Sequence, residues 1–96
     1  MQLLVTYDVS TTSKEGRRRL RRVARACTDF GQRVQKSVFE CSVDDKQMVV
    51  FRARLLDEVD LEEDSLRLYR LIGAFDEVVE HYGQDRRIDF DGPLIV

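Results

Sequence analysis

The chain has 96 residues, enough for one small domain, because a single hydrophobic core is usually built from about 50 to 200 residues. Its composition, with 43% apolar residues, 35% charged residues and one proline, excludes a disordered chain and a membrane-embedded one. The net charge of −2 conceals two halves of opposite sign, because residues 1–54 hold 12 Lys and Arg against 6 Asp and Glu, whereas residues 55–96 hold 4 against 12. A core this small is marginally stable alone, so a symmetric dimer is an attractive way to bury more surface.

The apolar run at 3–5 near the N-terminus is interrupted by Asp8 and has neither a basic leader nor a small-residue cleavage site. We therefore expect no secretory signal and no transmembrane span, and we expect a cytoplasmic protein that does not contact a membrane. The two cysteines, Cys27 and Cys41, lie in apolar patterns without a second pair. They predict buried free thiols in place of a disulfide framework or a zinc site.

The first half of the chain predicts a strand followed by a helix. Residues 1–9 are apolar and β-branched, which is typical of a strand, and a polar loop follows at 10–13. Thr12 and Glu15 have the spacing of a capping box, so the helix is expected to begin there. We expect it to end at Gly31, because glycine enters the left-handed conformation without steric cost.

The predicted helix carries two stripes of residues at the spacing i, i+3, i+4, i+7. The apolar stripe consists of Leu20, Val23, Ala24 and Cys27. The basic stripe, together with the neighbouring Arg17, is called here the arginine stripe and consists of Arg17, Arg18, Arg21, Arg22 and Arg25. Guanidinium groups bind phosphate through paired hydrogen bonds, so this stripe favours a polyanionic partner. The alternative is a solvated helix face that the acidic second half neutralises.

In the next segment, residues 32–43, side chains at alternate positions would face opposite sides of a strand. The segment therefore predicts β structure, either one bent strand or two short strands. Asp44 then caps a second predicted helix, which is expected to end within the acidic stretch 57–64 because carboxylates at a helix C-terminus oppose the helix dipole. The residues that lie near one face of this helix are Met48, Phe51 and Leu55.

Two further strands are predicted at 65–72 and 78–82. Strand, helix, strands, helix and strands in this order are typical of an α+β sandwich with both helices on one face of an antiparallel sheet. We therefore expect a ferredoxin-like split βαβ fold over residues 1–84, followed by a tail at 85–96 that docks elsewhere.

The sequence resembles a known family along nearly its whole length. The segments that carry the resemblance are Tyr7-Asp8-Val9, the arginine-rich helix, Gly31-Gln32-Arg33-Val34-Gln35-Lys36-Ser37-Val38-Phe39-Glu40 and Leu66-Arg67-Leu68-Tyr69-Arg70-Leu71. They are similar to those of the small CRISPR-associated nuclease-like subunit of the spacer-acquisition complex. The resemblance implies short strands at 33–36 and 37–41, and a homodimer in which the C-terminal segment pairs with the sheet of the other protomer.

The resemblance also implies a function. Members of this family bridge integrase dimers and hold the double-stranded DNA that becomes a new spacer. Some members also cleave RNA or DNA in a metal-dependent reaction.

Asp8 is the candidate metal ligand. A carboxylate at a strand end often caps the following loop, so an Asx turn onto residues 10–13 is its alternative role. Magnesium needs only one or two carboxylates when waters and substrate phosphates complete its shell, and the resemblance implies two Asp8 side chains meeting across a dimer axis. We expect Mg²⁺, with Mn²⁺ as a substitute, to polarise a phosphodiester oxygen and to orient or activate water.

Four more residues are candidates for the catalytic site. Tyr7 faces opposite to Asp8 by strand alternation, so it is expected in the core, although its hydroxyl suits a site role. The family pattern places Arg33, Ser37 and Phe39 on the active-site side, whereas an aromatic side chain at such a position more often belongs to the core or a dimer contact. His81 is expected to be a hydrogen-bonded surface or interface histidine.

Three functions stay open at this point. The first is a homodimeric subunit of CRISPR adaptation that binds double-stranded DNA and bridges integrase subunits. The alternative is a stand-alone magnesium-dependent endoribonuclease or endodeoxyribonuclease, and the two activities are compatible. A small ligand-binding or regulatory ferredoxin-like dimer is the third, which no glycine-rich phosphate loop or nucleotide fingerprint supports.

Overall fold

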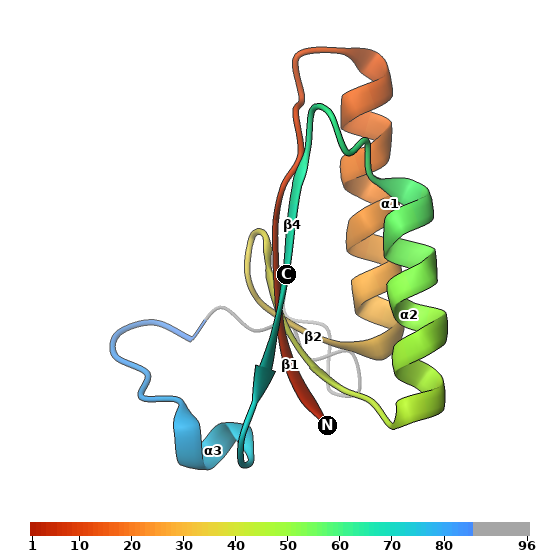
Figure 1. Ribbon diagram of the computed structural model, residues 1–96. Coiled ribbons are helices and arrows are strands. Elements are labelled where there is room, and N and C mark those ends of the chain that lie inside the picture. The colour runs from red at the N-terminus through yellow and green to blue at the C-terminus, as the bar shows by residue number, and fades with distance from the viewer. Residues whose placement is uncertain (86–96) are drawn as a thin grey trace.

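The structure, a computed structural model, describes residues 1–85, in which four strands form one antiparallel sheet with two long helices on one face (Figure 1). The strands lie in the order β2-β3-β1-β4, and each neighbouring pair is antiparallel. The described elements are β1 (Gln2–Asp8), α1 (Lys14–Phe30), β2 (Gly31–Gln35), β3 (Val38–Ser42), α2 (Asp45–Glu58), β4 (Ser65–Leu71) and the short α3 (Phe75–Val78). The expected ferredoxin-like α+β fold is confirmed.

The core lies between the sheet and the two helices. On β1 the side chains of Leu3, Val5 and Tyr7 face the helices and are buried, whereas the residues between them point to the open side of the sheet. The predicted face of α2 is buried against them, with Met48, Phe51 and Leu55 in the core. Cys27 and Cys41 are both buried free thiols, as expected.

The start of α1 differs from the prediction. The N-cap is Ser13, whose hydroxyl oxygen accepts a hydrogen bond of 3.0 Å from the Gly16 N–H. The capping box predicted from Thr12 and Glu15 is therefore wrong. In contrast, Asp44 caps α2 as predicted and shares a reciprocal capping box with Gln47.

Gly31 ends α1, but the predicted left-handed turn is wrong. Its backbone is extended, with φ −166° and ψ −163°, and the chain passes directly from α1 into β2. A Cβ atom at this position would overlap the carbonyl oxygen of Glu40 and the sulfur of Cys41 on β3. Glycine is therefore needed for the close approach of two strands.

Residues 32–43 form two short strands, β2 and β3, so one of the two predicted alternatives is confirmed. The chain turns at residues 36–37, and the register of the pair shifts between Arg33 and Gln35. This irregularity lies at the edge of the sheet, where bulges are common.

The strand predicted at 78–82 is not formed. After β4, Gly73 adopts a φ of 99°, and the chain then enters the single turn α3 and continues through residues 79–85 without a strand. Figure 1 places α3 beyond the end of β4, away from the helix layer. All but the first residue of the predicted docking tail at 85–96 lies outside the described residues. Of the helices in the described part of the chain, none combines the length and the apolar character needed to cross a membrane.

Candidate nucleic-acid interface

The arginine stripe lies on the exposed side of α1. Its five side chains are exposed, whereas the opposite side of the helix buries Val23, Ala26 and Cys27. From Arg17 to Arg25 the helix rises by about 12 Å, which allows the stripe to follow several phosphates of a nucleic-acid strand.

The members of the stripe differ in their partners. Arg22 Nε lies 2.8 Å from a carboxylate oxygen of Glu58 on α2. Arg17 donates a hydrogen bond of 3.3 Å to the carbonyl oxygen of Thr11, which leaves its charge uncompensated. The remaining three, which form no ion pair and no side-chain hydrogen bond within residues 1–85, are Arg18, Arg21 and Arg25. Four guanidinium groups of the stripe therefore keep their full charge for an external anion.

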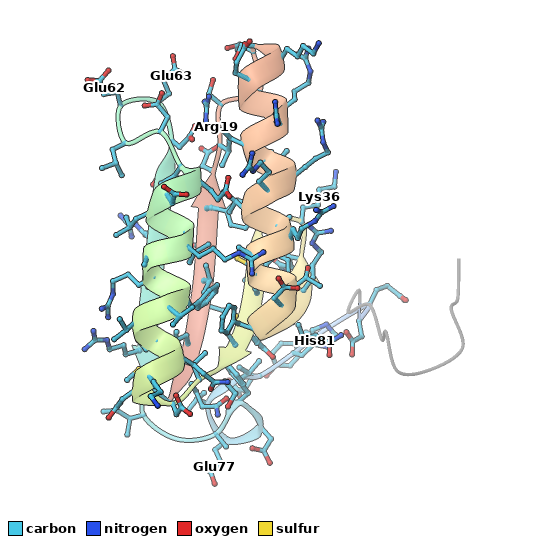
Figure 2. All side chains as sticks on the ribbon, turned by 90° about the vertical axis from the view of Figure 1, so that its right-hand side faces the viewer. Arg19, Lys36, Glu62, Glu63, Glu77 and His81 are labelled. Carbon is cyan, nitrogen blue, oxygen red and sulfur yellow. The ribbon has the colours of Figure 1, made fainter. Side chains whose placement is uncertain are left out.

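The loop between α2 and β4 and the β2–β3 turn lie on different sides of α1 and carry exposed side chains of opposite charge. Figure 2 shows Glu62 and Glu63 at the loop between α2 and β4, and Lys36 beside the other flank of α1. Lys36 belongs to the β2–β3 turn, so sequence spacing alone did not place it beside the arginine stripe. The separation favours a polyanion that approaches α1 from the hairpin side.

Asp8 is the last residue of β1 and is exposed on the face of the sheet opposite the helices. It pairs in register with Ser65 of β4. Within the described chain its carboxylate makes no hydrogen bond or ion pair, so the Asx turn onto residues 10–13 is not formed. The carboxylate of Asp64 accepts the hydrogen bond of the Ser10 N–H instead, at 3.0 Å. Asp8 is therefore available to bind a cation.

Three of the other catalytic candidates form a cluster on the helix side of the sheet. The ring centroids of Tyr7 and Phe39 lie 6.2 Å apart, and the guanidinium carbon of Arg33 lies 5.1 Å from the Phe39 centroid. Burial raises the pKa of Tyr7 above its usual value, and a hydrogen bond from Arg33 partly opposes this change. Tyr7 is thus protonated at neutral pH, and one chain does not bring this cluster together with Asp8, which points to the other face.

Ser37 joins this cluster through its backbone, because its carbonyl oxygen accepts a 3.2 Å hydrogen bond from the Tyr7 N–H. A hollow of about 410 Å³ opens beside it, lined by Leu20, Arg33, Gln35, Lys36 and Ser37. The Nε of Arg33 is buried without a hydrogen-bond partner among residues 1–85. Since Leu20 and Arg17 are three residues apart and neighbours on the surface of α1, the hollow borders the arginine stripe. Arg33 and Ser37 therefore lie beside α1 and also beside Tyr7, the chain neighbour of Asp8.

His81 lies near the C-terminal end of α1 (Figure 2) and lines a hollow with Gln2, the first residue of β1, whereas Asp8 is the last residue of that strand. The Nε2 of His81 is 3.0 Å from the carbonyl oxygen of Gln84, and the hollow, of about 830 Å³, is also lined by Phe30 at the end of α1. The 17 residues of α1 span about 25 Å. Within one chain His81 is therefore not placed to act as a general base beside Asp8.

Comparison with known proteins identifies the family of this chain. Residues 1–74 match the family described as CRISPR associated protein Cas2. The chain belongs to the Cas2 family. It is 52% identical over 96 residues to a CRISPR-associated endoribonuclease Cas2 of Moorella thermoacetica, covering 100% of both proteins. A CRISPR-associated endonuclease Cas2 of Halalkalibacterium halodurans is 50% identical over 95 residues, or 99% of each.

The similarity to Cas2 extends to a solved structure. The crystal structure of Streptococcus pyogenes Cas2 at pH 6.5 has a TM-score of 0.78 and 49% identity, covering 86% of this chain and 100% of that one. The resemblance inferred from the sequence motifs is therefore confirmed at the level of family and fold.

Proposed function

We propose that the protein is a subunit of CRISPR adaptation that binds double-stranded DNA as a homodimer and bridges integrase subunits. Metal-dependent phosphodiester cleavage at Asp8 is its second activity. The observation that carries the proposal is the row of exposed arginines on α1, four of which form no ion pair within residues 1–85. The Cas2 names of its relatives connect the chain to the CRISPR system.

Duplex DNA suits the stripe because contacts from arginine go to backbone phosphates. Such contacts position the protein without reading the sequence, so binding is tolerant of sequence and strongly salt-dependent. Lys36 and the hollow that holds Arg33 extend the cationic surface from α1 onto the β2–β3 turn.

A homodimer brings two copies of Asp8 together on the open face of the sheet. This face carries apolar and aromatic side chains that the helices do not cover; Leu4 pairs in register with Tyr69, which is 41% exposed, and Asp8 lies at the end of the same strand. A second copy packed on this face buries those side chains and places the two carboxylates at one interface.

The metal site requires that second copy. Within residues 1–85 no group of three or more His, Cys, Asp or Glu side chains is arranged to hold an ion. One chain supplies Asp8 as a hard oxygen ligand, and its carboxylate has no hydrogen-bond or ion-pair partner among residues 1–85. Two such carboxylates, with waters and substrate phosphates, fit the needs of Mg²⁺ or Mn²⁺. A bound ion supplies charge stabilisation at phosphate and a more acidic water, while the arginine stripe holds the nucleic acid.

The acidic loop between α2 and β4 is the proposed contact surface for the integrase. Glu62 is exposed, and Glu63, although paired with Arg19, lies on the same loop. This surface repels nucleic acid and suits a basic patch of a protein partner.

A stand-alone magnesium-dependent endoribonuclease or endodeoxyribonuclease is the second candidate function. The names of the relatives, one an endoribonuclease and one an endonuclease, favour it, and so does the carboxylate of Asp8, which is unpaired within the described part of the chain. RNA is then the substrate alternative to DNA.

The test compares wild type with Asp8→Ala in duplex binding, in Mg²⁺-dependent cleavage and in spacer acquisition in cells. Glu77→Ala, which removes an exposed carboxylate from α3, at the other end of β4 from Ser65, is the control. We expect Asp8→Ala to keep duplex binding and acquisition and to lose cleavage. Acquisition lost with binding intact would place the function in the chemistry of Asp8, and duplex binding absent from wild type would refute the adaptation role.

A further inference from the structure

Asp64 precedes β4 and has a side chain that is 0% exposed. Its carboxylate accepts four hydrogen bonds from three segments of the chain. The donors are the N–H of Ser10 at 3.0 Å, the N–H of Asp60 at 2.9 Å, and the Nε and Nη2 of Arg19 at 2.9 and 3.3 Å. The Arg19 side chain pairs in addition with Glu63. A buried carboxylate with this many donors is firmly held.

The loop after β1, which Asp64 holds through the Ser10 N–H, also packs against the first turn of α1. A Cβ atom on Gly16, in the first turn of α1, would overlap the carbonyl oxygen of Ser10. Ser10 is thus held between the first turn of α1 on its carbonyl side and the carboxylate of Asp64 on its N–H side. Asp8, two residues earlier, pairs in register with Ser65, the residue after Asp64.

We infer that Asp64 is a positioning residue, which fixes the Asp8 carboxylate relative to the arginine stripe by holding Ser10 and Arg19 at once. The inference rests on the proposed function, since it assigns Asp64 a part in cleavage at Asp8. Arg19 is then an anchor of α1 and not a phosphate ligand, although it lies between two members of the stripe in sequence. Asp64 does not touch the substrate.

The variant Asp64→Asn keeps the size of the side chain but loses the charge that holds Arg19 and replaces one acceptor oxygen by a donor. The loop at Ser10 is then less constrained, while the arginine stripe is unchanged. Because misplacement of a reacting group by about 1 Å can cost about 100-fold in rate, we expect kcat for Mg²⁺-dependent cleavage to fall about tenfold or more. The KM for nucleic acid and the Kd for a DNA duplex are expected to change by less than about twofold, since the phosphate contacts remain.

The matched control is Glu58→Gln. It breaks the other ion pair between α1 and the second half of the chain, Arg22 with Glu58, and it has no bond to the loop of Ser10. A purely structural role of Asp64 would lower the melting temperature but leave kcat per folded molecule at the wild-type value, as we expect for Glu58→Gln.

Amide hydrogen exchange at Ser10 provides a readout that does not depend on activity. We expect exchange at this N–H to accelerate about tenfold or more in Asp64→Asn and to stay unchanged in Glu58→Gln, because only the first variant weakens the acceptor. Ser10→Pro, which deletes the donor but leaves the pair of Arg19 with Asp64, is expected to lower kcat as well, and less than additively with Asp64→Asn.

Two results would overturn the inference: unchanged Ser10 exchange in Asp64→Asn, or faster exchange with wild-type kcat per folded molecule. If the wild-type protein shows no Asp8-dependent cleavage, the nuclease part of the proposed function fails, and the exchange measurement alone still decides whether Asp64 fixes this loop.

Discussion

Replacing Arg18, Arg21 and Arg25 by glutamine removes the three guanidinium groups of the arginine stripe that have no partner within residues 1–85. Their side chains are exposed, so the triple variant is expected to fold as wild type does. It therefore isolates the electrostatic contribution of the stripe to duplex binding.

The expected salt dependence of the DNA affinity follows from counterion release. With Arg17, each chain offers four uncompensated guanidinium groups, and a homodimer that uses all of them neutralises about eight phosphates. The logarithm of the affinity is then expected to fall against the logarithm of the salt concentration with a slope of about −7. Within the arginine stripe, the triple variant keeps only Arg17 as an uncompensated guanidinium group in each chain, so the contribution of the stripe to the slope is expected to fall to about −2.

Fluorescence anisotropy of a labelled duplex over a salt series measures both slopes. The control is the double variant Arg22→Gln and Arg54→Gln, since each of these arginines already pairs with a carboxylate, Glu58 and Asp29 respectively. We expect the control to keep a slope near that of wild type. A triple variant with a slope still steeper than about −5, or a control that flattens the slope as much as the triple variant does, would refute the assignment of the stripe to phosphate binding.

Three further predictions concern stability and reactivity. Gly31→Ala forces a methyl group against Glu40 and Cys41, so it should lower the free energy of unfolding in urea by about 1–3 kcal/mol, and an unchanged value would contradict the close strand approach. Burial raises the pKa of both Cys27 and Cys41 to about 12. A thiol reagent at pH 8 should therefore label the native protein very slowly, and should label both cysteines in the unfolded protein. Fast labelling of the native protein would disprove the burial of the two thiols. The hydrogen bonds from Arg19 lower the pKa of Asp64, so the ionised carboxylate stabilises the fold at a pH above its ordinary pKa, and this stabilisation is lost as the pH falls through the lowered pKa. The difference in melting temperature between wild type and Asp64→Asn should therefore shrink in acid. A difference that stays constant would argue against the ionised pair.

Local patterns predicted the elements whose signals lie within a few residues. The cap of α2 depends on Asp44 and Gln47, three residues apart, and the stripe on α1 depends on helical spacing, so both were visible in the sequence. The cap of α1 was predicted one residue early, because Thr12 and Ser13 are both good caps, and in the structure it is the Ser13 hydroxyl that accepts the hydrogen bond of the Gly16 N–H.

Long-range contacts explain what the sequence did not reveal. Asp64 lies 54 residues from Ser10, so no local pattern shows that it binds the loop after Asp8. The same holds for the pairing of Arg22 with Glu58, and for Lys36, which a turn brings beside α1. The strand predicted at 78–82 has suitable alternation, but the chain turns away from the sheet at Gly73 before reaching it.

The measurement that tests the central claim most directly is an NMR titration of the protein with a DNA duplex. We expect the largest amide shift changes along the exposed side of α1, from Arg17 to Arg25, and at Lys36 in the β2–β3 turn, with little change in the acidic loop at 59–64. Changes concentrated in that loop, with the amides of α1 unaffected, would contradict the account.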